Sequence, residues 1–245
     1  MARSASFLVI ALALTMLTGC DSTQQEAARA RLKAERFIDS ASATVVRRRS
    51  ADVRVVAVKL VGGSTGSAIT VRLRNLATRP LHDLPISVGI LGARGDRSYL
   101  NAAPNTFYFE THLASIAAQG SVTWVFTTDR KLPVGATPFA VVGARSSVPA
   151  TVEHLLPQID VATASSPTSA NGARRLLVKV TNASAVPQYQ LQIYALGLDR
   201  GRYVAAGGAT LSHLGTESSE TVPLSLVGAR RPASIELEAL PTMFQ

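Results

Sequence analysis

The sequence predicts an all-β fold built from two tandem β-sandwich domains that follow a short helical tether. Two observations carry this prediction. Short segments with alternating apolar and polar residues are separated by glycine-rich turns, and the second half of the chain repeats motifs of the first half in the same order. The length agrees, because each half approaches the roughly 100 residues of a two-sheet sandwich.

The first 19 residues have the composition of a secretory signal. Arg3 gives a positive start, and an apolar stretch from Phe7 to Leu17 follows it. This stretch is shorter than the about 20 apolar residues that a membrane-spanning helix needs. The motif Leu17-Thr18-Gly19-Cys20 resembles the lipobox of bacterial lipoproteins. The resemblance implies cleavage before Cys20 and acylation of its thiol. A signal peptide that is cleaved without lipid addition is the alternative.

Cys20 is the only cysteine of the chain, so an internal disulfide is excluded and the domains must be stable through apolar packing. An acylated Cys20 would tie the chain to the extracytoplasmic face of a membrane, because two or more acyl chains suffice for stable anchoring. Asp21 resembles a signal that keeps lipoproteins in the inner membrane of some bacteria. The sequence leaves the choice between inner and outer membrane open.

Residues 20–51 form the predicted tether. Residues 24–38 are rich in Ala, Glu, Arg, Lys and Gln, which favour a helix, but they hold too few apolar positions for a buried face. Residues 39–50 have the composition of a polar linker and contain the basic cluster Arg47-Arg48-Arg49. We interpret this cluster as solvated linker, with attraction to anionic lipid headgroups as the alternative.

The net charge of +9 raises the question of nucleic-acid binding. The basic residues are scattered along the predicted strands without the interleaved aromatic residues that single-strand binders use. We therefore do not expect nucleic acid as a partner.

From residue 52 the pattern is typical of strands. Residues 53–58 and 69–74 place apolar and polar side chains on opposite faces, most cleanly in the second segment. Turn clusters at Gly62-Gly63-Ser64 and at residues 92–96 separate the predicted strands.

The repeat begins with residues 69–75 and Pro80, which match residues 176–182 and Pro187. Further matches follow in the same order. They pair residues 84–86 with 191–193, residues 116–126 with 214–224, and the segment from Val142-Gly143-Ala144-Arg145 to Pro157 with the segment from Val227-Gly228-Ala229-Arg230 to Pro241. We predict two homologous modules, 52–157 and 158–245.

The order of strand, Asn, small and polar residues, Pro and strand resembles the start of the FxLYD-type and related immunoglobulin-like modules of bacterial surface lipoproteins. Residues 193–201 are similar to the next element of those modules, whereas residues 90–96 lack its aromatic residue. The resemblance covers most of residues 52–245 and implies an immunoglobulin-like fold without an active site. Asn75 and Asn182 are expected to have structural roles, because asparagine caps turns.

No motif predicts a catalytic, cofactor or metal site. Zinc-site spacing is absent from the four histidines, which are His82, His112, His154 and His213. No nucleophile elbow, phosphate loop or dinucleotide fingerprint occurs. Glu236 and Glu238 fall on one face of the last predicted strand, where a solvated surface is favoured over a cation site. We predict a protein without enzymatic activity and without a cofactor.

Phe107-Tyr108-Phe109, together with Trp124, is the one concentration of aromatic residues. Strand alternation would bury Phe107 and Phe109, expose Tyr108 and place Trp124 in the core. The alternative is an interaction surface that includes Tyr108 and Trp124 and binds a protein or a glycan, because exposed aromatic residues anchor interfaces.

These observations favour a lipid-anchored binding or scaffold protein of the bacterial cell envelope, which uses two sandwiches to present a surface away from the membrane. An exposed sheet edge is one expected mode of recognition. The alternatives are an accessory subunit of an envelope enzyme or transport complex and, more weakly, a hydrolase whose site assembles from scattered residues.

Overall fold

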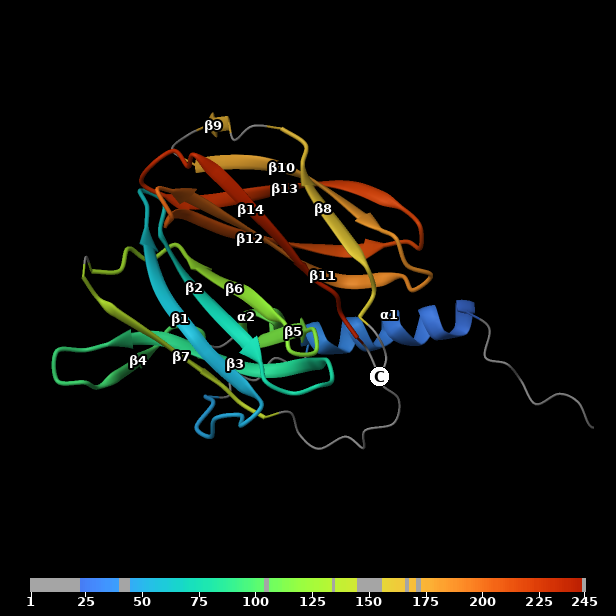
Figure 1. The fold of residues 1–245 in the computed structure, drawn as a ribbon, viewed down its shortest axis with the longest axis horizontal. Coiled ribbons are helices and arrows are strands. Elements are labelled where there is room, and N and C mark those ends of the chain that lie inside the picture. The colour runs from blue at the N-terminus through green and yellow to red at the C-terminus, as the bar shows by residue number, and fades with distance from the viewer. Residues whose placement is uncertain are drawn as a thin grey trace, which may run out of the picture.

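The computed structural model describes residues 23–39, 45–103, 106–133, 135–144, 156–165, 168–170 and 173–243. Within these residues the chain forms fourteen strands and two helices. The predicted all-β class and its sandwich arrangement are confirmed, and Figure 1 shows the sheets stacked as layers with helix α1 (Thr23–Asp39) along one side. The predicted signal peptide and Cys20 lie outside the described residues.

The first module consists of two small antiparallel sheets. Its strands are β1 (Val53–Gly62), β2 (Ser67–Asn75), β3 (Leu81–Leu91), β4 (Arg97–Tyr99), β5 (His112–Ile116), β6 (Ser121–Thr128) and β7 (Thr137–Val142). One sheet has the order β1-β2-β6, and in the other β3 pairs with β4, β5 and β7. The short helix α2 (Tyr108–Thr111) lies between β4 and β5 in the chain.

The second module is one strongly curved antiparallel sheet. Its strands are β8 (Ile159–Thr163), β9 (Thr168–Ala170), β10 (Ala173–Asn182), β11 (Gln188–Asp199), β12 (Arg202–Leu214), β13 (Ser219–Gly228) and β14 (Ser234–Leu240). The order is β14-β11-β12-β13-β10-β8, with β9 beside β10. Contacts between β14 and β8 close the sheet over its own apolar core. The predicted boundary at residue 157 stays a prediction.

The two modules share one strand topology. Leu84 of β3 lies opposite Leu113 of β5, and Leu191 of β11 lies opposite Leu211 of β12 in the same way. Strand β12 runs without interruption where the first module has β4, α2 and β5. Even the strained backbone recurs, because Asp83 and Gln190 occupy equivalent positions and both have a φ of 54°.

Asn75 and Asn182 have the structural roles that the sequence predicts. Both side chains are fully buried, and each donates its amide to backbone carbonyls on two sides. The closest accepting carbonyls, at 2.8 to 2.9 Å, belong to Arg79 and Ala117 for Asn75 and to Val186 and Gly215 for Asn182. Each asparagine therefore joins the turn after its own strand to the turn that precedes β6 or β13.

The predicted terminal match of the repeat is wrong. Val142 ends β7, the last strand of the first module, whereas Val227 lies in β13, the strand before the last of the second module. The pairing registers equate Val142, which lies opposite Ile86, with Ala239, which lies opposite Ile193. The similar Val-Gly-Ala-Arg sequences occur at the ends of two strands that are not equivalent, so the match paired the wrong strands.

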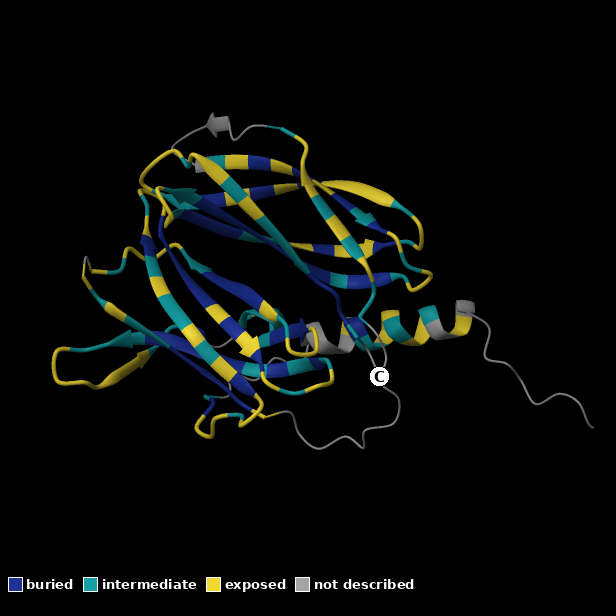
Figure 2. Cartoon of the chain, viewed as in Figure 1, coloured by how far each residue is buried: buried dark blue, intermediate teal, exposed yellow. Residues whose placement is uncertain are grey.

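The modules pack face to face through a shared apolar core. Strand β11 is buried from Leu191 to Gly197 because both of its faces are covered. Leu191 and Ile193 point into the core of the second module, while Tyr194 and Leu196 join the core of the first. Figure 2 shows buried segments, in dark blue, on the strands between the outer layers.

The cross-module contact also has a polar rim. The Lys59 ammonium of β1 lies 5.5 Å from the centre of the Tyr203 ring of β12, a cation–π distance. Contacts of β12 with β1, β2 and β6 extend along this face.

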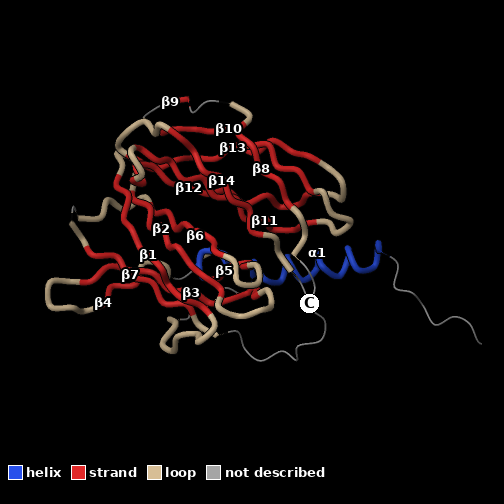
Figure 3. The backbone as a smooth tube through the Cα atoms, viewed as in Figure 1, coloured by secondary structure: helices blue, strands red, loops and turns tan. Residues whose placement is uncertain are grey.

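The tether differs in part from its prediction. The expected helix at residues 24–38 is present as α1, but it does have a buried position, because Ala34 is only 3% exposed and α1 contacts β11. Residues 45–50 are not a free polar linker: the Val46 N–H donates to Ser87 Oγ at 2.8 Å and the Ser50 N–H to the Val142 carbonyl at 2.8 Å. Figure 3 shows α1 against the strands.

The shared core leads to a test of coupling between the modules. We expect Leu196→Ala to lower the free energy of unfolding by about 2–4 kcal/mol, because it removes buried methyl groups from a packed core. Urea unfolding followed by Trp124 fluorescence, which reports on the first module, should show this loss although the change lies in the second. Leu177→Ala is the control, since Leu177 is 42% exposed in the same module. Independent unfolding of the two modules would contradict the shared core.

Candidate functional site

The aromatic segment at residues 107–109 is a helical turn and not a strand. The Phe107 N–H donates to Glu110 Oε2 at 3.0 Å, and the Glu110 N–H donates back to the Phe107 carbonyl at 2.9 Å. This reciprocal capping starts α2 and reverses the predicted burial. Phe107 is 68% exposed, while Tyr108 and Phe109 are partly buried. The prediction from strand alternation is therefore wrong for Phe107 and Tyr108.

Trp124 lies in the core, as strand alternation predicts, and not on the alternative interaction surface. Its side chain is fully buried, and its ring stacks with that of Phe126 at a centroid distance of 6.3 Å. The indole N–H donates to the Phe109 carbonyl at 3.3 Å. Trp124 therefore supports the aromatic segment from below.

Asn101 fixes the other end of this segment. Its side chain is buried, and its Oδ1 accepts the Val88 N–H at 2.9 Å. Its amide donates to the carbonyls of Ile86 at 2.9 Å and Glu110 at 2.8 Å. The side chain thus continues the pairing of β3 beyond the end of β4 and ties α2 to that strand.

Tyr108 belongs to a cluster with Asp83 and His112. Its hydroxyl donates a short hydrogen bond to Asp83 Oδ1, and its ring lies flat on the His112 imidazole, with centroids 3.9 Å apart and planes at 3°. Burial lowers the pKa of His112, against the opposing effect of the Asp83 carboxylate. The Thr111 hydroxyl, 2.9 Å from His112 Nδ1, also donates to the Tyr108 carbonyl, so we interpret it as a cap of α2.

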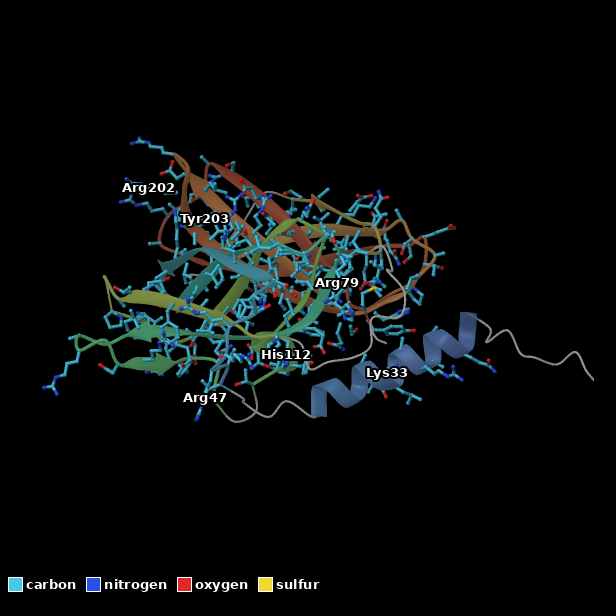
Figure 4. The ribbon with its side chains drawn as sticks, turned by 60° about the horizontal axis from the view of Figure 1, so that its bottom comes forward. Lys33, Arg47, Arg79, His112, Arg202 and Tyr203 are labelled. Carbon is cyan, nitrogen blue, oxygen red and sulfur yellow. The ribbon has the colours of Figure 1, made fainter. Side chains whose placement is uncertain are left out.

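A cavity of about 380 Å³ opens where the tether helix and the two modules meet. We call it the junction cavity. It is lined by Ala34 of α1, by Phe107, Tyr108, Phe109 and Glu110 of the first module, and by Gln190, Gln192, Thr210 and Ser212 of the second. Figure 4 brings this side of the molecule forward and labels Lys33 on α1 and His112 beside α2.

The sheet wall of the junction cavity is neutral and already ordered. Gln192 is only 5% exposed, and its amide donates to the Gln190 carbonyl at 3.0 Å and to Thr210 Oγ1 at 3.1 Å. Burial raises the pKa of the Glu110 carboxyl on the opposite wall, and the Phe107 N–H partly offsets this rise.

A second cavity of about 340 Å³ adjoins the first at Ala34. It is lined by Arg31, Ala34 and Glu35 of α1 and by Tyr189, Gln190, Ser212 and His213 of the second module. The two cavities share Ala34, Gln190 and Ser212, so α1 crosses a depression that continues along β11 and β12.

Sequence reasoning did not find the sheet wall, because glutamine and threonine in strands look like ordinary surface residues. The repeat holds a usable signal for the aromatic wall. Leu84 and Leu113 are 29 positions apart, whereas the equivalent Leu191 and Leu211 are 20 apart, so the first module has nine additional residues here. The aromatic segment lies within this longer stretch.

Glu238 lies at the contact between the modules and not on the solvated face that the sequence predicts. Its Oε2 accepts the Thr123 N–H of β6 at 2.7 Å, while Glu236 is exposed. Burial raises the pKa of Glu238 to about 7, although the Thr123 N–H and Arg72 favour the charged form. The neighbouring Tyr194 hydroxyl has its pKa raised as well, first by burial and then by the charges of Glu238 and Glu110.

In the part of the chain that the structure describes, no three side chains among His, Cys, Asp and Glu come together as a metal site would require. His154 lies outside that part. Among the described residues, neither helix, α1 nor α2, is long and apolar enough to cross a membrane.

No protein-family model matches the chain, and no curated protein matches it. Among solved structures, red sea bream transglutaminase is similar over 81% of this chain and 32% of its own, with 12% identity and a TM-score of 0.21. This chain thus spans about a third of the length of that protein. A likeness at this TM-score carries no argument about fold or function.

Glu238 makes the stability of the fold depend on pH. Its folded pKa of about 7 lies above the ordinary 4.5, so the folded chain binds this proton more tightly than the unfolded chain. The contribution is therefore fully present below pH 4.5 and is lost as the pH rises to about 7, by up to roughly 3 kcal/mol.

We expect Glu238→Gln to remove this loss, because the amide oxygen can still accept the Thr123 N–H and carries no charge to bury. The free energy of unfolding of the variant, relative to that of the unchanged chain, should rise between about pH 5 and 7. Glu220→Gln, at an exposed position of β13, is the control and should leave the profile unchanged. A Glu238→Gln variant with the original pH profile would refute the assignment.

Proposed function

We propose that the chain is a lipid-anchored, non-enzymatic binding protein of the bacterial cell envelope, tied to a membrane through Cys20, and that the junction cavity binds its ligand. The observation that carries the proposal is the position of this cavity. The tether helix, the first module and the second module each supply one wall. Small-molecule sites often lie at such meetings of domains, and this volume is within their usual range.

The walls of the junction cavity favour binding over catalysis. Its described lining residues are aromatic, small or neutral and polar, apart from Glu110. The Glu110 carboxyl already accepts the Phe107 N–H. Gln192 and Thr210 hydrogen-bond to each other, an arrangement that orients groups for recognition.

The proposed anchor would place the cavity near the membrane. Helix α1 begins three positions after Cys20, and Ala34 lies eleven residues further along the helix. At a rise of about 1.5 Å per residue, this distance is roughly 17 Å. The proposed ligand site is then close to the lipid surface.

The anchor has a direct test. We expect the full chain to fractionate with membranes and to incorporate a labelled fatty acid. Cys20→Ala should abolish both, because no other thiol is available. The level of folded Cys20→Ala protein in the soluble extracytoplasmic fraction serves as the control for expression. Unchanged membrane retention together with unchanged acyl labelling would refute lipidation.

The binding function has a separate test in cells. We expect a photo-crosslinking amino acid at position 107 of the anchored chain to capture a defined adduct, because Phe107 lines the junction cavity and is 68% exposed. The same amino acid at position 186, where Val186 is 51% exposed and lines neither cavity described above, is the matched control.

An adduct specific to position 107 would support the proposal. If that adduct is a subunit of an envelope enzyme or transport complex, the chain is an accessory subunit of that complex. Identical products at the two positions, or none at position 107, would count against a ligand in this cavity.

A further inference from the structure

We infer that the junction cavity binds a neutral sugar ring, with Phe107 packed against the apolar face of the ring. The inference rests on the proposed function and names the class of ligand for the same site. Three features of the cavity lead to it: an ordered aromatic wall, a wall of neutral hydrogen-bonding groups, and a lining without basic side chains.

The aromatic wall is set in place before any ligand arrives. Phe107 is a large apolar side chain left mostly in water, which is unfavourable unless something covers it. Its backbone is held through the N–H bond to Glu110 and the return bond to its carbonyl. The Phe109 carbonyl is fixed by the Trp124 indole beneath it. With the backbone held in this way, the freedom lost on binding is mainly that of the Phe107 side chain.

The opposite wall offers groups that both donate and accept. Gln192 and Thr210 are bonded to each other, and both amide protons of Gln192 are already donated, so their oxygen atoms remain as acceptors for a ligand. Ser212 lies farther along β12, the strand of Thr210, and is exposed, so its hydroxyl can both donate and accept. An apolar ligand would take these groups out of water without replacing their hydrogen bonds. Hydroxyl groups can satisfy both the donors and the acceptors.

The charge of the lining argues against an anion. None of its described residues is lysine or arginine, and Arg31 lines the neighbouring cavity instead. A phosphate or carboxylate would meet the Glu110 carboxyl without a basic partner. Partial burial of Glu110 raises its pKa, which also weakens the attraction for a cation. A neutral ligand is therefore the best match.

A sugar ring combines the required properties. Its C–H bonds give one apolar face, which suits the negative face of an aromatic ring, and its hydroxyl groups lie around the edge. The cavity is of a size for a small ligand and not for a folded protein. A short peptide also has apolar and polar parts, so it is the competing ligand in the test.

The experiment titrates the full chain, purified in detergent, with N-acetylglucosamine, its β-1,4-linked disaccharide, cellobiose, maltose and the peptide tetra-alanine, by isothermal titration calorimetry. We expect saturable binding of at least one sugar and none of the peptide. Phe107→Ala should weaken that binding at least tenfold, and Thr210→Val should weaken it severalfold. Val186→Ala should leave it unchanged. A change in the fluorescence emission of Trp124, the only tryptophan, would show that binding affects the Phe109 segment.

Thermal unfolding of each variant checks that the fold is intact, and Phe107→Ala is safe in this respect because the side chain is exposed. Sugar binding that survives Phe107→Ala unchanged would overturn the inference, since the site would lie elsewhere. Binding of the peptide alone, lost in Phe107→Ala, would overturn the sugar class and leave the proposed function standing. Binding of no probe would overturn the sugar class as well, and crosslinking at position 107 would then decide the proposed function by itself.

Discussion

The apolar contact between the two modules is the constraint on which the rest of the structure depends. Strand β11 serves two cores at once, with Ile193 on one face and Tyr194 and Leu196 on the other. Because neither side of that strand is free, the second module holds one orientation against β1, β2 and β6. That orientation brings the α2 segment opposite Gln192 and Thr210, and so creates the junction cavity. The Glu238 carboxyl lies at the same contact and accepts the Thr123 N–H across it.

The junction cavity arises where the two modules differ in structure. The modules agree closely in their frameworks, down to Asn75 and Asn182 and to the left-handed residues at equivalent positions. They differ where the first module replaces one long strand with β4, a loop and α2. Asn101 compensates for the lost strand pairing, and Phe107 projects from the new turn. The strand framework common to both modules thus supports the cavity. The segment in which the first module departs from that framework provides the aromatic wall.

The sequence predicted the parts of the structure that depend on local periodicity. Alternation indicated β1 and β2, composition indicated α1, and the turn chemistry of asparagine indicated the role of Asn75. The remaining features depend on contacts between distant residues. The three aromatic residues at 107–109 are compatible with a strand and with a helical turn. The hydrogen bond between Phe107 and Glu110 stabilises the turn. Alternation placed Glu238 on a face of its strand, but it could not show that another module covers that face.

The path of the tether has a mechanical meaning. Helix α1 contacts the second module, while residues 45–50 are hydrogen-bonded to β3 and β7 of the first, so the chain touches the later module before it enters the earlier one. Tension applied at the N-terminal end reaches the contact at Ala34 first and the hydrogen bonds of Val46 and Ser50 afterwards. The two attachments therefore act in series, with the α1 contact in front. A pull that detaches α1 therefore lengthens the tether before it reaches the hydrogen bonds of Val46 and Ser50.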